Sequence, residues 1–283
     1  NHWVKKQMDL YNEEAISKGV RVIPSCGYDS LPSDIGTFFA VNQMNKSVKK
    51  VEVFHSASGG ASGGTIESIF LMGKLPKEMR DPFLLNPQES VSDFQRKKSA
   101  DSLSIKWIEE AQKWSGLGLF SVANTRVVRR SAALMEMNQK SYGNNFVFKE
   151  YGAYASKNSA RIASIGLILG FLIISSPLKW LVRRFLPKPG EGPSVEVQNN
   201  GWFKGVFVAE AEDGEKQVST IYGDGDPGYK STSKMLCESA LTIALSDNLP
   251  GGENFGGFLT PATGLGIPLI ERLKKADIKF EVV

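Results

Sequence analysis

Cysteine and histidine are scarce in this sequence. Its 283 residues include two cysteines and two histidines, and neither Cys26 nor Cys237 lies in a C-x-x-C pair. A structural zinc site needs four such ligands, usually at short spacing, so we expect no metal centre. Two isolated cysteines also argue against a disulfide framework, which favours an intracellular, reducing compartment.

Acidic residues are absent from the long stretch between Glu150 and Glu191. The same stretch contains six basic residues, which are Lys157, Arg161, Lys179, Arg183, Arg184 and Lys188. Because the whole chain has 34 basic and 30 acidic residues, the net charge of +4 belongs to this one segment. Nucleic-acid binding predicts basic residues interleaved with aromatics over a wider surface, so we expect no nucleic-acid partner.

A secretory signal pattern is also missing. No basic segment followed by an apolar run and a small-residue cleavage site is present, and the first residue is Asn1. We therefore expect the chain to begin partway into a longer protein.

One apolar run stands out between the basic residues. The stretch 162–178 has 17 uncharged residues, slightly short of the ~20 that span a bilayer, and it contains serines and Pro177. Burial in the core is one interpretation. Attachment to an anionic membrane or lipid-droplet surface, aided by the flanking basic residues and Trp180, is an equal alternative. A full span fits less well.

The order of the remaining patterns predicts an α/β fold. The opening reads as helix, strand at 20–25 and helix, typical of the end of a Rossmann-like parallel sheet. Alternating strands follow at 48–57 and near 145–155, and a hairpin around Asp213-Gly214 precedes the helix 229–245. A mostly antiparallel sheet with helices on one face is expected from these. In the helix 229–245, Met235, Leu236, Ala240, Leu241 and Ala244 are expected to pack on that face.

Two regions are therefore predicted. Residues 1–46 form the C-terminal remnant of a dinucleotide-binding domain, and residues 47–283 form a substrate or dimerisation domain that includes the apolar run. Residues 76–105 read as an irregular excursion, and 187–200 as a linker.

A G-x-G-x-x-G pattern occurs at Gly223, Gly225 and Gly228. In a dinucleotide-binding loop, the backbone N–H groups face a pyrophosphate. Here Asp224 and Asp226 would place negative charge beside it, and no parallel strand with a ribose-binding acid follows the helix. The pattern favours a tight turn whose acids stabilise the N-terminus of the helix 229–245.

Five segments of the chain, taken together and in order, resemble those of a known enzyme family. The stretches VIPSCGYDSLPSDIG, SGGTIES, LPKPGEGPS, GDGDPGYKSTSKMLCESALTIAL and GGFLTPATGLGIPLIERLKKADIKFEV occur in the order found in saccharopine dehydrogenase-like oxidoreductases. The chain is similar to that family over nearly its whole length, including its bacterial trans-acting enoyl reductases. The resemblance implies an N-terminal Rossmann domain that binds NAD or NADP, of which about half is missing here. It also implies that the GDGDPG turn belongs to the second domain.

The candidate site lies at the end of the first strand. Ligands of parallel sheets gather at the carboxyl ends of strands, which places Cys26, Gly27, Tyr28, Asp29 and Ser30 against a nicotinamide or its substrate. The same residues would equally suit a simple turn, with Gly27 at the bend and Asp29 or Ser30 capping a helix. Cys26 has no evident base, so a buried small residue is favoured over a nucleophile.

A glycine-rich loop is the second candidate. Ser62, Gly63 and Gly64 precede a helix and could bind an anionic group of the substrate on backbone N–H groups, although a plain crossover loop is the more common meaning. His55 is interpreted as a strand residue rather than a general base. No catalytic residue is assigned, because a nicotinamide carries the hydride chemistry itself.

The sequence thus predicts the C-terminal portion of an NAD(P)-dependent oxidoreductase of lipid or glycolipid metabolism with a lipid-type substrate. This chain alone is not expected to bind the cofactor tightly. The alternative is a non-catalytic membrane- or lipid-droplet-associated protein that keeps the fold. A homodimer and a cytoplasmic or membrane-associated location are the further expectations.

Overall fold

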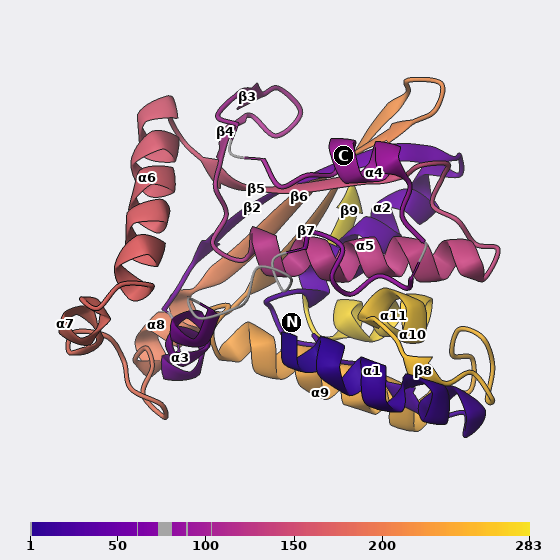
Figure 1. Cartoon of the computed structure of the whole chain (residues 1–283). Coiled ribbons are helices and arrows are strands. Elements are labelled where there is room, and N and C mark those ends of the chain that lie inside the picture. The colour runs from indigo at the N-terminus through magenta and orange to yellow at the C-terminus, as the bar shows by residue number, and fades with distance from the viewer. Residues whose placement is uncertain (1, 61, 73–80, 89, 103) are drawn as a thin grey trace.

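The computed structural model describes residues 2–60, 62–72, 81–88, 90–102 and 104–283. It has a mixed α/β fold (Figure 1), with two sheets among the described residues. The larger sheet has seven strands and the smaller one has two. The predicted fold class is confirmed.

The seven-stranded sheet is mostly antiparallel. Its spatial order is β3 (Trp107–Ile108), β4 (Lys113–Gly116), β5 (Val147–Tyr154), β2 (Val48–Ser58), β6 (Trp202–Ala211), β7 (Lys216–Asp224) and β9 (Ile278–Val282). Only the β2–β5 pair is parallel among its described neighbours. The hairpin predicted around Asp213-Gly214 is β6–β7, and β9 joins it in the same sheet.

The helices vary widely in length and position. They are α1 (His2–Ser17), α2 (Leu31–Met44), α3 (Gly63–Met72), α4 (Asp93–Lys98), α5 (Ser121–Met137), α6 (Lys157–Ile174), α7 (Lys179–Arg183), α8 (Val195–Asn200), α9 (Lys230–Leu245), α10 (Pro261–Gly264) and α11 (Gly266–Lys275). In Figure 1, α2, α5 and α11 lie under the sheet, with α1 and α9 farther from it.

The main core lies between this helical layer and one face of the sheet. Alternate strand residues such as Val51, Val53 and Phe207 point to that face and are fully buried, as the period of two in a strand requires. They pack against Ile35 of α2 and other apolar side chains of α5, α9 and α11. A smaller cluster of Phe54, Ile108, Tyr151 and Val208 covers part of the opposite face.

The small sheet is formed by two very short parallel strands. β1 (Arg21–Val22) pairs with β8 (Gly257–Phe258), which comes from the far end of the chain. The predicted strand 20–25 is therefore shorter than expected, because Pro24 has no N–H to continue a ladder. Residues 26–44 share one core with the seven-stranded sheet. The division at residue 46 stays a prediction.

One local prediction was wrong. In α9 only Met235 of the five expected packing residues is buried, whereas Leu236, Ala240, Leu241 and Ala244 are exposed. The buried face of α9 is instead completed by the small polar residues Ser231, Ser239 and Thr242, whose hydroxyl groups bond to backbone carbonyls. The excursion 76–105, part of which is outside the described residues, contains α4, and the linker contains α8.

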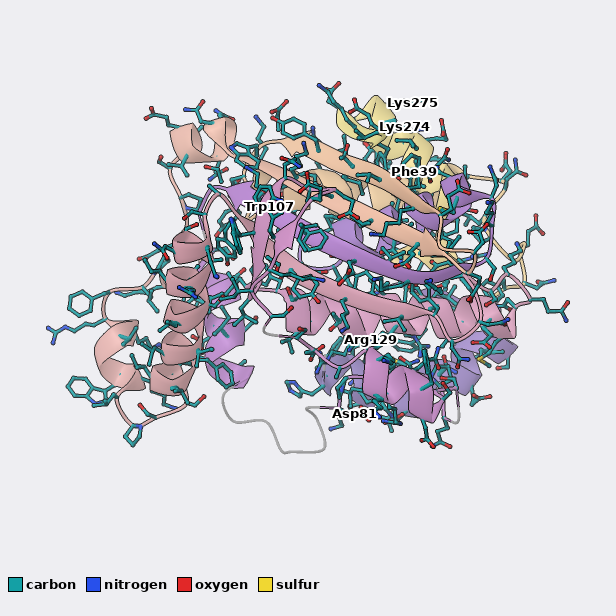
Figure 2. All side chains as sticks on the ribbon, turned by 90° about the horizontal axis from the view of Figure 1, so that it is seen from above. Phe39, Asp81, Trp107, Arg129, Lys274 and Lys275 are labelled. Carbon is teal, nitrogen blue, oxygen red and sulfur yellow. The ribbon has the colours of Figure 1, made fainter. Side chains whose placement is uncertain are left out.

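Helix α6 stands apart from the helical layer. Figures 1 and 2 both place it at one end of the sheet, where it contacts β4 and β5. Only Ala160 and Ser164 are buried, and the Ser164 hydroxyl accepts a hydrogen bond from the Leu117 backbone N–H at 3.0 Å. Most of its apolar side chains are exposed, so burial in the core of this chain, one of the two favoured alternatives, is wrong.

Candidate functional site

The turn at residues 26–30 lies between β1 and α2, as expected, and packs against the start of α9. The Tyr28 backbone N–H donates to the Thr232 hydroxyl at 3.1 Å, and a Cβ on Gly27 would come 3.2 Å from the Thr232 methyl. Tyr28 is buried edge-on against Phe203, and Asp29 is exposed. Burial raises the pKa of the Cys26 thiol to about 11, so the thiol is a poor nucleophile at neutral pH.

Ser30 begins a chain of buried polar groups that the sequence did not reveal. Its hydroxyl donates to Asn124 Oδ1 of α5 at 3.2 Å, and Asn124 Nδ2 donates to Glu150 Oε1 of β5 at 2.8 Å. Ser33 of α2 donates to Glu150 Oε2 at 2.7 Å and lies 2.9 Å from His55 Nε2 of β2. We call Ser30, Asn124, Glu150, Ser33 and His55 the polar network.

The network defines the tautomer of His55. The single hydroxyl proton of Ser33 is donated to Glu150, so Ser33 can only accept from His55, and the imidazole proton therefore lies on Nε2. His55 Nδ1 is then a bare acceptor, and it is buried with no partner among the described residues. Burial lowers the pKa of His55 below its usual 6.5, although the nearby Glu150 opposes the shift, so the ring is neutral at pH 7.

The glycine-rich candidate loop is partly occupied by the protein itself. The Ser62 hydroxyl accepts from the Thr65 N–H at 3.0 Å and caps α3. The Gly63 N–H donates to the Glu191 carbonyl at 2.9 Å, and a Cβ on Gly63 would overlap the Lys188 carbonyl. Two N–H groups at the start of α3 therefore already have partners, and Gly64 is exposed. Substrate binding at Ser62, Gly63 and Gly64 stays a prediction.

The GDGDPG turn has the geometry of a helix cap. Asp226 is fully buried, and its carboxylate accepts from the N–H groups of Gly228, Tyr229 and Lys230 at 3.1, 3.2 and 2.9 Å. These are the donors that a phosphate would need at the start of α9. The turn therefore does not fit a pyrophosphate, and Asp226 is the acid that stabilises the helix N-terminus.

A second buried acid ties α2 to α10. Asp34 accepts from the Ala262 N–H at 2.8 Å and from the Ser131 hydroxyl, which in turn contacts Thr260 at 2.6 Å. Burial raises the pKa of Asp34 to about 7, against the lowering effect of these hydrogen bonds. The cluster joins three segments that are distant in sequence, so its evident role is structural.

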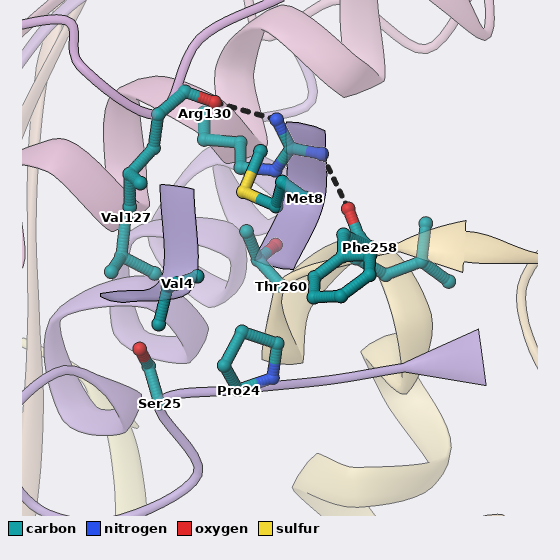
Figure 3. Close-up of a pocket in the computed structure, with 10 residues that line it drawn as sticks. Val4, Met8, Pro24, Ser25, Val127, Arg130, Phe258 and Thr260 are labelled. Carbon is teal, nitrogen blue, oxygen red and sulfur yellow. Dashed lines mark hydrogen bonds between the residues drawn. The ribbon is translucent and has the colours of Figure 1, made fainter. Parts of the chain in front are cut away.

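The hollows on this side of the molecule are apolar. One of about 390 Å³ is lined by Trp3, Gln7, Val22 and neighbouring apolar side chains of α1, β1 and β8, and contains no titratable side chain. A cavity of about 10 Å³ shares Val4, Pro24 and Phe258 with it and lies beside Arg130, which donates to the backbone carbonyls of Leu85 and Phe258 (Figure 3). That volume holds one water at most. Neither hollow reaches the polar network.

No group of three or more His, Cys, Asp and Glu side chains in the described parts of the chain is arranged to hold a metal ion. Ser30 was among the predicted site residues and His55 was interpreted as a strand residue, whereas Ser33, Asn124 and Glu150 were not predicted to belong to a site. Ser33 precedes an acid in a helical run and Glu150 sits in an alternating strand, so each looked like an ordinary polar residue. The pairing of β2 with β5, which places Glu150 beside Val53, brings Glu150 close to His55, and the packing of α2 and α5 against the sheet adds Ser33 and Asn124.

Comparison with known proteins gives relatives over nearly the whole chain. A putative trans-acting enoyl reductase of Mycobacterium tuberculosis is 29% identical over 305 aligned positions, which cover 99% of this chain and 71% of the relative. The trans-acting enoyl reductases of Mycobacterium leprae and Mycobacterium ulcerans are each 28% identical, over 97% of this chain and 70% of the relative. No family model matches the sequence.

Proposed function

We propose that this chain is the substrate-side part of an oxidoreductase that reduces a carbon–carbon double bond in a lipid-type substrate with NAD(P)H. The proposal is supported by relatives named trans-acting enoyl reductase that align with 97–99% of the chain. The structural observation that supports it is the polar network. Its hydrogen bonds connect Ser30, in the predicted site turn, to His55, whose Nδ1 has no partner among the described residues. Membership of the saccharopine dehydrogenase-like family remains part of the proposal.

The reaction class defines what the protein must supply. Reduction of an enoyl group adds a hydride to the β carbon and a proton to the α carbon, so the double bond becomes a single bond while the cofactor is oxidised. A bound nicotinamide would supply the hydride. The protein must place the substrate and deliver one proton.

His55 is the group best suited to hold that proton. Ser33 and Glu150 fix the ring through Nε2, which leaves Nδ1 as the atom that gains and loses a proton. Because the pKa of His55 is lowered, its protonated form is a stronger acid than an ordinary imidazolium. We therefore propose His55 as the proton donor and Ser33, Glu150 and Asn124 as positioning residues. Because Nδ1 is buried and neither hollow described above reaches it, the proposal requires that substrate binding opens a path to this atom.

The cofactor would lie on residues outside the GDGDPG turn, since Asp226 occupies the donors there. The turn at Cys26–Ser30 remains our proposed approach of the nicotinamide end, because it follows a parallel strand and precedes a helix. Whether the cofactor is NAD or NADP is a property of residues that contact its ribose, and we assign none.

The test is a kinetic comparison in the natural protein that contains this chain, following NADPH oxidation with a trans-2-enoyl thioester. His55→Gln should lower kcat by roughly 10²–10⁴-fold while far-UV circular dichroism stays unchanged. In the parent, kcat should fall as pH rises above the pKa of His55, and this limb should be missing in His55→Gln.

The control is His2→Gln, which removes a histidine in the exposed first turn of α1. It should have parental kinetics. Full activity in His55→Gln would remove His55 from the mechanism and leave the oxidoreductase proposal intact, whereas no reduction by the parent would contradict the enzyme proposal.

The exposed apolar helix α6 favours a second candidate, attachment to an anionic lipid surface without turnover. Among the described residues, α6 is the one helix whose length and composition would allow it to cross a membrane. Its window is 11% buried, and Trp180 and Phe185 just beyond it are also exposed. No acid is within ion-pair distance of Lys179, Arg184 or Lys188 among the described residues, whereas Arg183 pairs with Glu67 at 2.7 Å.

Vesicle co-sedimentation tests whether α6 attaches the protein to anionic lipid or is exposed without binding it. Lys179→Glu/Arg184→Glu/Lys188→Glu should bind vesicles with anionic lipid at least ~100-fold more weakly, since each basic residue contributes ~1 kcal/mol at the surface. Lys97→Glu/Lys98→Glu/Lys140→Glu makes the same charge change at exposed positions outside α6 and α7 and should bind like the parent. Equal binding by both variants would reject the electrostatic attachment.

A further inference from the structure

The strand β9 is an open edge of the large sheet. It is the last strand in the sheet order, and its described partner is β7 alone. An open edge presents unpaired backbone N–H and C=O groups, which can pair with a strand of another chain. Proteins that stay monomeric commonly cover or distort such edges.

The hydrogen-bond pattern shows which groups of β9 are free to pair. The Val283 N–H donates to the Val218 carbonyl at 2.9 Å, so Val283 and Val218 form a hydrogen-bonded pair. Hydrogen-bonded pairs alternate with non-bonded pairs along an antiparallel ladder, so Glu281 and Lys279 also bond to β7. The backbone groups of Ile278, Phe280 and Val282 therefore point away from the sheet.

The sequence of β9 is complementary to itself. When two copies of IKFEV run antiparallel with their Phe280 residues opposite each other, Ile278 faces Val282 of the second copy. Lys279 then faces Glu281 of the second copy, and this happens twice across the two-fold axis. If one strand moved by a single residue, the outward N–H and C=O groups of one copy would face residues of the other copy whose backbone groups point back to its own β7.

The side chains are available for this pairing. Lys279 and Glu281 are exposed, and neither has an ion pair among the described residues, although the Lys279 ammonium lies 5.7 Å from the centre of the Tyr222 ring. Opposed positions of non-hydrogen-bonded pairs have the closest approach, with Cα atoms about 4.5 Å apart. Phe280 stays on the core face, where it meets Phe39 edge-on at 5.5 Å.

We propose that the chain forms a two-fold dimer by antiparallel pairing of β9 with β9 of a second copy, which joins the two seven-stranded sheets into one. We assign a second copy of this chain as the partner of β9 for two reasons that hold in the same register, with the two Phe280 residues opposite each other. The outward N–H and C=O groups of the two strands face one another, and both Lys279–Glu281 pairs have opposite charge. The pairing involves only short strands, so the dimer is concentration-dependent. This inference is independent of the proposed reaction.

The test uses charge reversal on an exposed edge, where folding is not at risk. The parent, with a chain mass of 31.0 kDa, should reach twice that mass at high concentration in sedimentation velocity. Lys279→Glu and Glu281→Lys each place like charges opposite one another twice and should dissociate at least about tenfold more readily. The double variant Lys279→Glu/Glu281→Lys should dimerise like the parent.

Mixing gives a further prediction. Lys279→Glu with Glu281→Lys should form a heterodimer, because both opposed pairs are again of opposite charge. Lys216→Glu, a single charge reversal on β7 outside the edge, is the control and should dimerise like the parent. A parent that is monomeric at every concentration would overturn the proposal, and so would a dimer that neither single variant weakens.

Discussion

Two helices of this protein, α2 and α6, have opposite environments despite apolar sequences of similar length. Helix α2 contains Ser33, Asp34 and Thr37, yet its first seven residues are all buried. Helix α6 has no charged residue from Ile162 to its end at Ile174, yet of its residues only Ala160 and Ser164 are buried. Figure 1 places α2 under the sheet and α6 beside one end of it.

The difference shows that burial depends on the surfaces available for packing rather than on hydrophobicity. The sheet, α5, α10 and α11 surround α2. Asp34 accepts from the Ser131 hydroxyl and the Ala262 N–H, Ser33 bonds to Glu150 and His55, and Thr37 donates to the Ser33 carbonyl. Among the described elements, the main contacts of helix α6 are with β4, β5 and α7, and none of these covers its apolar face. Its apolar side chains are therefore left for water or for a partner that this chain does not provide.

The largest expected effect comes from truncating equivalent isoleucines of the two helices. Ile35 of α2 is 0% exposed and Ile162 of α6 is 72% exposed. Ile35→Ala should lower the free energy of unfolding by about 2–5 kcal/mol, because it leaves a cavity in a packed core. Ile162→Ala should change it by less than about 0.5 kcal/mol. Urea denaturation of both variants measures the contrast, and similar losses would show that α6 is packed in solution.

The second expected effect is a pH dependence of the free energy of unfolding, which arises from the buried Asp34 of α2. Its pKa is raised from 3.8 to about 7 in the folded state, so its contribution is fully present below pH 3.8 and is lost as pH rises through 7. The loss is on the order of 4 kcal/mol, at 1.36 kcal/mol per pH unit. Helix α6 has no acid to titrate.

Denaturant unfolding at a series of pH values tests this assignment. The stability of Asp34→Asn relative to the parent should increase as pH rises from 5 to 8. The desolvated neutral His55 acts in the opposite direction, because its lowered pKa favours unfolding as pH falls below 6.5. Parallel pH profiles of the two proteins would mean that Asp34 keeps an ordinary pKa.

The smallest effects come from a pair of helix-interior glycines. A Cβ on Gly36 of α2 would overlap the ring of Phe207 and come 2.7 Å from Ile221 Cδ1, whereas a Cβ on Gly166 of α6 would meet nothing within 4 Å. Gly36→Ala should cost about 1–3 kcal/mol through overpacking. Gly166→Ala should stabilise the helix by up to about 1 kcal/mol, since alanine is the better helix former. Thermal unfolding with opposite shifts for the two variants is the expected result, and shifts of the same sign would contradict it.

Some parts of the site could be predicted and others could not. The turn Cys26–Ser30 was placed correctly between a strand and a helix from Pro24, Gly27 and the apolar pattern around them. The chemistry of GDGDPG was also interpretable, because carboxylates and phosphates compete for the same N–H groups. His55 and Glu150 could not be paired, since their separation of 95 positions is closed by a parallel strand contact that follows no local rule.

The sequence by itself determined the periodic features of this protein: longer helices such as α1, α2 and α9, the β6–β7 hairpin, and the segment without acids from which α6 arises. These depend on side-chain spacing and on turn residues, both of which are local. The tertiary structure alone decided that small polar residues of α9 face the core, that α6 stays exposed, and that Ser33, His55 and Glu150 meet. Those outcomes depend on which surfaces remain unoccupied once the sheet and α2 have packed, and no single segment contains that information.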